Sequence, residues 1–202
     1  MLSEEEFIVL DYMDIFKNVD EASLQEDTGL DPEKISAILK KFSEKGFVTK
    51  IMEGMWQIES AGEEEAAKYR EKMLEESGRR DEIIKYCQEF EEINKKFKEL
   101  VTRWQMKDEG GVLVPNDHRD PDYDFKIIEE LNEIHEETKR LISKISEIIP
   151  MYKRYISRFE NALNRLMEGK LDYMDRARDS YHNIWFELHE SLLKLSGMRR
   201  VE

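Results

Sequence analysis

Apolar residues recur three and four positions apart along most of the chain, which is the spacing of an amphipathic helix. Ser3 with Glu6 and Ser60 with Glu63 match capping boxes, and Asp31 is placed to cap another helix. Glycines that can end a helix follow several of these segments. The sequence therefore predicts a mainly α-helical chain with helices at residues 3–17, 21–27, 32–45, 60–76, 81–107, 123–149, 150–168 and 172–196.

Strand-favouring residues interrupt this pattern only between the third and fourth predicted helices. Residues 48–51 and 55–59 flank a short turn centred on Gly54, which predicts a two-stranded hairpin. The loop at residues 108–121 is polar and is expected to lie at the surface. Three helices followed by a hairpin is the order of a winged helix.

The segment SLQEDTGLDPEKISAILKKFSEKGFVTK, followed by MWQIESAGEE, resembles the core of MarR-type and related winged helix-turn-helix regulators. The resemblance covers about residues 1–76 and implies a winged helix-turn-helix domain over that range. In such regulators the third helix enters the major groove of double-stranded DNA. The resemblance thus implies a DNA-contacting set consisting of Lys34, Ser36, Ala37, Lys40, Lys41, Lys45 and Lys50.

The charge of this region opposes DNA binding. Residues 1–60 contain six lysines and no arginine against 14 aspartates and glutamates, a net charge of −8. Glu53 also stands at the tip of the hairpin, where a basic residue is expected. A winged helix that contacts another protein instead of DNA, or that has an accessory role, therefore stays open as the alternative function.

The second part of the chain predicts a helical bundle. Between residues 81 and 107 the apolar residues fall in heptads, and the remaining segments add three more amphipathic helices. Four such helices predict an antiparallel bundle at residues 79–202, used for dimerisation, for sensing a small-molecule effector, or for both. We expect a homodimer, although the heptad seam could equally pack against helices of its own chain.

Three strings in this part, WQMKD, NDHRDPDYD and DSYHNIWFELHESLL, carry a second resemblance. They are similar to a helical module of bacterial winged-helix proteins and of the C-terminal ends of some phosphoenolpyruvate-utilising, pyruvate phosphate dikinase-like proteins. The resemblance covers about residues 80–197 and implies organisation without a catalytic assignment. The catalytic and nucleotide-binding segments of such enzymes are absent from these residues, which excludes a dikinase.

Aromatic and polar residues of the same part predict a pocket for an organic ligand. The candidate ligand-binding residues are Trp104, Asn116, Asp117, His118, His135, Tyr181, His182, Trp185 and His189. The competing interpretation is that they are core residues whose polar groups are paired within the protein.

Metal and catalytic sites are not predicted. No HxxxH or ExxH pair is present, and the run Asp120-x-Asp122-x-Asp124 lacks the glycine and the glutamate of a calcium loop. We interpret those aspartates as helix caps. No nucleophile motif or phosphate-binding loop occurs, so we expect neither an enzyme nor a bound cofactor.

Overall composition indicates the cellular compartment in which the protein is expected. The 32 basic and 46 acidic residues give a net charge of −14, and Cys87 has no second cysteine to pair with. No apolar run is long enough to span a bilayer. These features favour a cytoplasmic protein without a membrane segment, and the Glu and Lys bias is typical of heat-loving organisms.

Overall fold

The computed structural model describes residues 2–198. It is mainly helical with small antiparallel sheets, which confirms the mainly α-helical part of the prediction. The chain divides into two compact units: Met1–Arg80 together with Trp185–Glu202, and Asp81–Ile184. The sequence places the whole last helix with residues 79–202, whereas in the structure its residues from Trp185 onward group with the N-terminal unit.

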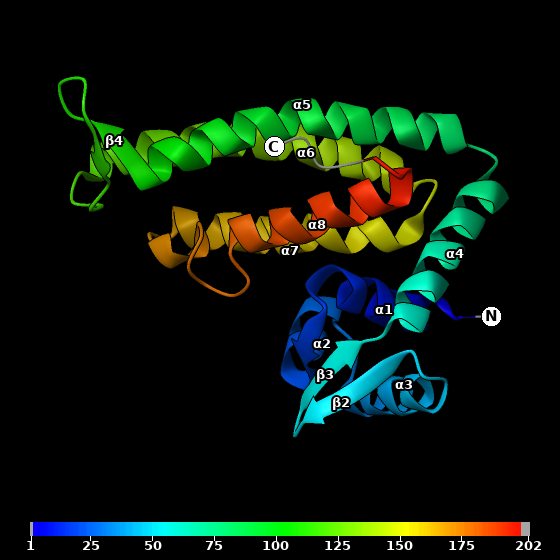
Figure 1. Cartoon of the computed structure of the whole chain (residues 1–202). Coiled ribbons are helices and arrows are strands. Elements are labelled where there is room, and N and C mark those ends of the chain that lie inside the picture. Colours follow the sequence, from blue (N-terminus) through cyan, green and yellow to red (C-terminus); the bar gives the residue numbers. More distant parts are fainter. Residues whose placement is uncertain (1, 199–202) are drawn as a thin grey trace. The chain divides into compact units, whose positions relative to one another are not determined.

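The first unit contains three helices and a three-stranded sheet before its long fourth helix (Figure 1). The strands lie in the order β1-β3-β2, all antiparallel, with Val19 opposite Trp56 and Thr49 opposite Gln57. The elements are α1 (Glu4–Phe16), β1 (Asn18–Asp20), α2 (Glu21–Thr28), α3 (Pro32–Glu44), β2 (Val48–Met52), β3 (Met55–Ile58) and α4 (Ser60–Ser77). The hairpin β2–β3 was predicted, whereas β1 was missed because three residues are too few to show a period of two.

Local sequence explains most of the boundaries of these helices. The Ser3–Glu6 capping box is confirmed, since the Ser3 hydroxyl accepts from the Glu6 N–H at 3.2 Å and the Glu6 carboxylate accepts from the Ser3 N–H at 3.0 Å. Gly29 ends α2 at φ +71°, in the left-handed region that glycine favours. Asp31 occupies the position before α3, but its side chain makes no capping bond.

The second predicted capping box is wrong. Ser60 is the first residue of α4, and the residue that precedes the helix is Glu59, without a side-chain cap. The reason is that the sheet sets this boundary: the Glu59 N–H donates to the Phe47 carbonyl at 2.8 Å. The backbone of Gly62 lies close to that of Phe47, since a Cβ at Gly62 would lie 2.4 Å from the Phe47 carbonyl oxygen.

The second unit is built on long helices, and α5, α6 and α7 lie side by side in Figure 1. Its elements are α5 (Arg80–Gln105), β4 (Met106–Asp108), β5 (Leu113–Pro115), α6 (Pro121–Ser146), a 3-10 turn η1 (Pro150–Lys153), α7 (Arg154–Met167), a second such turn η2 (Leu171–Tyr173) and the start of α8 (Tyr181–Ser196). None of the helices in the described part of the chain has the length and apolar character needed to cross a bilayer.

Two predicted boundaries in this unit are wrong. Part of the segment 108–121, which was expected to be a loop, forms strand β5. This strand pairs with β4 in a small hairpin, in which Met106 lies opposite Pro115. The last helix begins at Tyr181 instead of near residue 172. There the chain makes turns, in which the Asp172 carbonyl accepts from the N–H groups of Arg176 and Ala177.

The heptad seam of α5 packs against helices of its own unit. Ile83, Phe90, Phe97 and Trp104 are all buried. Across the seam Phe97 contacts Tyr181, with ring centroids 5.7 Å apart. On the rim, Lys96 of α5 pairs with Glu137 of α6 at 2.7 Å. The sequence left open whether this seam lies within or between chains, and these contacts lie within the chain.

Candidate functional site

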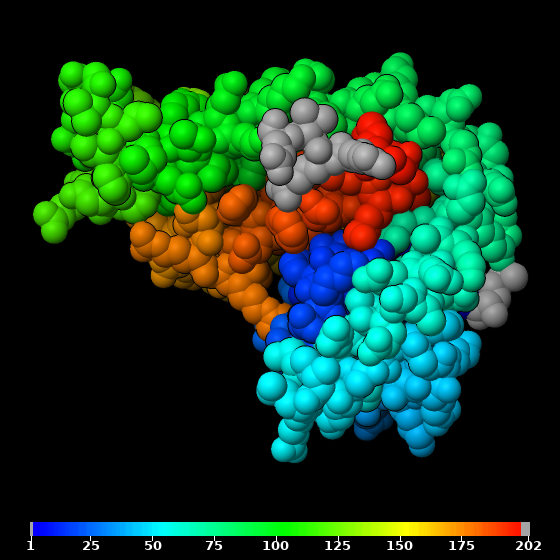
Figure 2. Space-filling model, in the orientation of Figure 1, coloured from blue at the N-terminus to red at the C-terminus, as the bar shows by residue number. Residues whose placement is uncertain are grey.

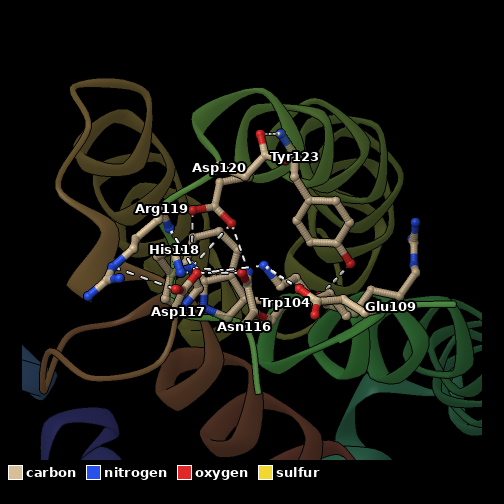
Figure 3. Close-up of polar contacts among 11 residues, drawn as sticks. Trp104, Glu109, Asn116, Asp117, His118, Arg119, Asp120 and Tyr123 are labelled. Carbon is tan, nitrogen blue, oxygen red and sulfur yellow. Dashed lines mark hydrogen bonds and ion pairs between the residues drawn. The ribbon is translucent and has the colours of Figure 1, made fainter. Parts of the chain in front are cut away.

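The loop after β5 is held against the end of α5 by Asn116 (Figure 3). The backbone N–H of Asn116 donates to the Gln105 carbonyl at 2.8 Å, and its side-chain amide donates to the Trp104 carbonyl at 3.0 Å. The Tyr123 hydroxyl donates to the Arg103 carbonyl at 3.0 Å. Three carbonyls that the end of a helix leaves without partners are thereby satisfied, which fixes the residues that follow Asn116.

The half-buried His118 and the buried Asp124 form a pair next to this anchor. The His118 Nδ1 lies 3.2 and 3.1 Å from the two carboxylate oxygens of Asp124, whose side chain is only 4% exposed. The second hydrogen of the Asn116 amide goes to Asp124 at 2.9 Å. Both amide hydrogens of Asn116 are therefore used, so the 3.2 Å approach of that amide to His118 Nδ1 is not a bond donated to the ring.

This count of hydrogens fixes the tautomer of the histidine. Nδ1 carries a proton and donates it to Asp124, so in the neutral ring the lone pair is on Nε2. Within the described residues Nε2 makes no hydrogen bond. The ring also packs on Trp104, with centroids 4.4 Å apart. His118 is thus held in one orientation with one nitrogen unused.

The backbone of His118 is unusual as well. Its φ is +56°, in the left-handed region that residues other than glycine rarely adopt. The Asn116 side chain stabilises this turn by accepting from the His118 N–H at 3.2 Å. Such conformations persist where the surroundings enforce them, and they concentrate at functional sites.

Two cavities meet at His118. One, of about 260 Å³, is lined mainly by apolar side chains of α6 and the end of α7, among them Phe125, Ile128 and Leu166. The other, of about 510 Å³, is lined by polar groups, among them Asp117, Lys170 and Arg176. His118, Gly169 and Leu171 line both. The site therefore presents an apolar wall and a polar wall on either side of one imidazole.

The predicted ligand-binding residues do not form one cluster. Trp104, Asn116, Asp117 and His118 come together at the site just described. The remaining members lie elsewhere along the helices: His135, Tyr181, His182, Trp185 and His189.

His135 and Tyr181 form a separate buried pair inside the helices. The His135 Nδ1 lies 3.3 Å from the Tyr181 hydroxyl. Burial lowers the pKa of His135 and raises the pKa of Tyr181, so the hydroxyl donates and Nδ1 accepts. His182 packs near Phe97, with ring centroids 6.0 Å apart. These contacts favour the core interpretation for the pair His135 and Tyr181.

Trp185 and His189 belong to the other compact unit and are buried there, at 3% and 4% exposure. The burial of both residues fits a place in the core. In the part of the chain that the structure describes, no three histidine, cysteine or carboxylate side chains gather closely enough to hold a metal ion.

Two of the three aspartates at the start of α6, Asp120 and Asp124, have different roles. Asp120 caps the helix, accepting from the Tyr123 N–H at 3.1 Å, which confirms the capping interpretation for that residue. For Asp124 the capping interpretation is wrong, because its carboxylate is buried against His118 and Asn116. A signal was present in the sequence: Asp124 precedes Ile127, Ile128 and Leu131 on the apolar stripe, and a carboxylate on such a stripe needs a partner.

The walls of the two cavities were missed. Phe125, Leu166 and Leu171 read as ordinary apolar positions, and Tyr173 and Arg176 lie in a segment that was expected to be helical. The end of α7 and the turns after it bring Leu166, Leu171, Tyr173 and Arg176 beside the His118 loop, whereas Phe125 lies on α6, seven residues after His118.

The second candidate surface is the outer face of α3. Every residue of the DNA-contacting set, including Ser36, Ala37 and Lys50, is exposed. Lys34 is bound to Glu5 at 2.6 Å, and Lys41 is bound to Glu6. Lys45 and Lys50 lie over the rings of Phe47 and Trp56, at 5.5 and 5.7 Å. These two lysines and Lys40 make no ion pair within residues 2–198.

The hairpin β2–β3 ends in apolar side chains. Ile51 and Met52 are 45% and 64% exposed, beside Glu53 in the turn. Figure 2 shows the tip of this hairpin, in cyan, standing out from its surroundings. A basic side chain is absent from the turn itself, and Lys50 is the nearest one.

Comparison with protein-family models, with curated proteins and with solved structures found no match.

Proposed function

We propose that the protein is a winged-helix DNA-binding regulator. Residues 1–76 form the winged helix-turn-helix domain, in which α3 enters the major groove and the β2–β3 hairpin is the wing. The helices α5, α6 and α7 of the second unit form a bundle that pairs two chains and responds to an effector. The protein acts in the cytoplasm, where its DNA is accessible.

The element order supports this proposal. Two helices, α2 and α3, are joined by a turn that contains Gly29, and a twisted antiparallel hairpin follows α3 directly. Helix-turn-helix proteins expose the second helix of such a pair for the groove. The buried residues of α3, Ile35, Ile38, Leu39 and Phe42, all lie on one stripe, which leaves the opposite face open.

The observation that carries the proposal is the charge on that open face. Lys40, Lys45 and Lys50 are exposed and make no ion pair within the described residues, although the unit around them is acidic. Lysines positioned in this way bind phosphate oxygens and release counterions from DNA. Lys34 and Lys41 are expected to contribute less, because each is already bound to a carboxylate of α1.

Charge reversal tests the proposal. We expect Lys40→Glu combined with Lys45→Glu to weaken binding of a fluorescein-labelled DNA duplex by at least about tenfold, measured by fluorescence anisotropy at fixed salt. The matched control is Lys98→Glu combined with Lys126→Glu, which makes the same charge change on exposed lysines of α5 and α6. Equal affinity of both double variants would contradict the assignment of the α3 face.

The exposed apolar tip favours a second function. Ile51 and Met52 suit a protein partner better than a phosphate backbone, and Glu53 beside them repels DNA. On this alternative the winged helix docks a protein partner, and the lysines of α3 form the rim of that interface. Replacing Ile51 and Met52 with serine would then abolish partner binding, and DNA affinity would be absent in the unchanged protein.

A further inference from the structure

The site at His118 has a built polar centre and an apolar recess beside it. Asp124 and Asn116 fix the ring, and the ring nitrogen Nε2 has no hydrogen-bond partner in the described chain. The two cavities that meet there measure about 260 and 510 Å³. Together they reach the size range of small-molecule sites, roughly 300–1,000 Å³.

The apolar recess requires a hydrophobic ligand body. Phe125 and Met167 line it and are 51% and 56% exposed, which is high for such large apolar side chains. Ile128 and Leu166 close the inner side and are buried. A hydrophobic group seated here would cover Phe125 and Met167 and remove their apolar surface from water.

The polar side requires a head group that pairs with His118. The carboxylates of the polar wall already face cations. The Asp117 carboxylate lies 3.6 Å from the Arg119 guanidinium and 3.7 Å from the Lys107 ammonium, and the Asp172 carboxylate lies 3.7 Å from the Arg176 guanidinium. The unused partner is the ring nitrogen of His118. With Nδ1–H bonded to Asp124, Nε2 is the ring nitrogen left to meet a ligand, and it is a donor when the ring carries both protons. An anionic oxygen in front of Nε2 would complete that arrangement, and hydrogen bonds between ionised groups are about twice as strong as neutral ones.

We propose that this site binds a small amphipathic carboxylate. Its apolar body fills the recess between α6 and the end of α7, and its carboxylate accepts a hydrogen bond from His118 Nε2. Lys170 and Arg176, which pair with Glu168 and Asp172, also line this cavity. The inference goes beyond the proposed function, since it assigns a ligand class without reference to DNA.

A matched pair of ligands tests the head group. The full-length protein is titrated with 4-phenylbutyrate and with 4-phenylbutan-1-ol, which share one apolar body, in calorimetry without DNA. We expect the carboxylate to bind at least about tenfold more tightly than the alcohol, as a charged hydrogen bond contributes. A DNA-free titration keeps its outcome separate from that of the DNA-binding experiments.

His118→Asn is the informative variant. Asparagine tolerates φ near +56°, and its amide nitrogen replaces Nδ1 as the donor to Asp124, while the group corresponding to Nε2 is lost. We expect the variant to keep the wild-type melting temperature within a few degrees and to bind both ligands with the weaker affinity of the alcohol. Phe125→Ser, in contrast, should lower the affinity for both ligands by the same factor.

Several results would overturn the proposal. Absence of binding for both ligands would rule out a ligand site at His118. Equal affinity of the wild-type protein for the two ligands would rule out the contact between the carboxylate and His118. Tighter binding of the alcohol would mean that Nε2 acts as an acceptor. An unchanged preference for the carboxylate in His118→Asn would place the anion elsewhere.

Discussion

Arg70→Met is expected to lower the free energy of unfolding by about 3–5 kcal/mol, because it removes the cation of the buried Asp11 carboxylate and one of the three cations at the buried Asp14 carboxylate. Arg70 of α4 is 5% exposed, and its guanidinium binds Asp11 at 2.6 and 2.9 Å and Asp14 at 2.8 Å. Asp11 and Asp14 lie one turn apart on α1 and are themselves buried. Chemical denaturation followed by circular dichroism measures the change.

The control for this variant is an exposed pair of the same kind. Arg103→Met breaks the ion pair with Glu130, but both side chains are about half exposed, at 47% and 48%. Exposed pairs contribute about 0–1 kcal/mol, so the second variant should be near neutral. Similar losses of unfolding free energy in both variants would mean that the buried Arg70 ion pairs stabilise the protein no more than an exposed pair does.

The pH dependence of stability distinguishes the loss of the Arg70 charge from the loss of its packing contacts. Burial raises the pKa of Asp14, but Lys17, Arg70 and Lys194 outweigh it, so the net pKa lies below its usual value of 3.8. That contribution to stability is present above pH 3.8 and is lost as the pH falls through the lowered pKa. In Arg70→Met, Asp14 loses one of the three cations that lower its pKa, so this pKa rises and the deficit in stability should shrink as the pH is lowered from 7 toward 4.

Tyr181→Ala should destabilise the second unit by about 3–5 kcal/mol, the usual cost of removing a buried aromatic ring. Tyr181 is fully buried and contacts three other helices. Its ring centroid lies 5.7 Å from that of Phe97 and 4.7 Å from that of Phe159, and its hydroxyl bonds to His135. Thermal unfolding measured by calorimetry reports the loss as a lower melting temperature.

Tyr181→Phe is the companion variant, since it keeps the ring and removes only the hydroxyl. Its expected cost is about 1–2 kcal/mol, because the His135 Nδ1 then lacks its donor. A larger effect for Tyr181→Phe than for Tyr181→Ala would contradict the view that packing of this ring holds α5, α6 and α7 together.

Much of the fold could be predicted because local chemistry encodes it. The Ser3 and Glu6 side chains and Gly29 act within a few residues of themselves, and the apolar stripe of α3 has the period of a helix. The failures lie where distant contacts decide. The sheet, through the Glu59 to Phe47 hydrogen bond, sets the start of α4 in place of a capping box. The three residues of β1 exist as a strand only because β3 pairs with them.

The His118 site could be predicted only in part. The string Asn116-Asp117-His118 predicted polar groups for a ligand; all three residues line one cavity, and Asn116 and His118 contact Trp104. Asp124 was assigned a local role, since an aspartate near a helix start usually caps it. Besides residues near the start of α6, the cavity walls come from the end of α7 and the turns after it, far along the chain from residue 118. Tertiary packing alone creates that neighbourhood.

The salt dependence of DNA affinity tests the central proposal most directly. Fluorescence anisotropy of the unmodified protein with labelled genomic fragments, repeated over a salt series, reports how many phosphates are neutralised. Three lysines per chain predict that log affinity falls linearly with log salt, with a slope of about −3 per chain, and that some fragments bind more tightly than others. No binding at the lowest salt would contradict DNA recognition and favour the protein-docking function of the β2–β3 tip.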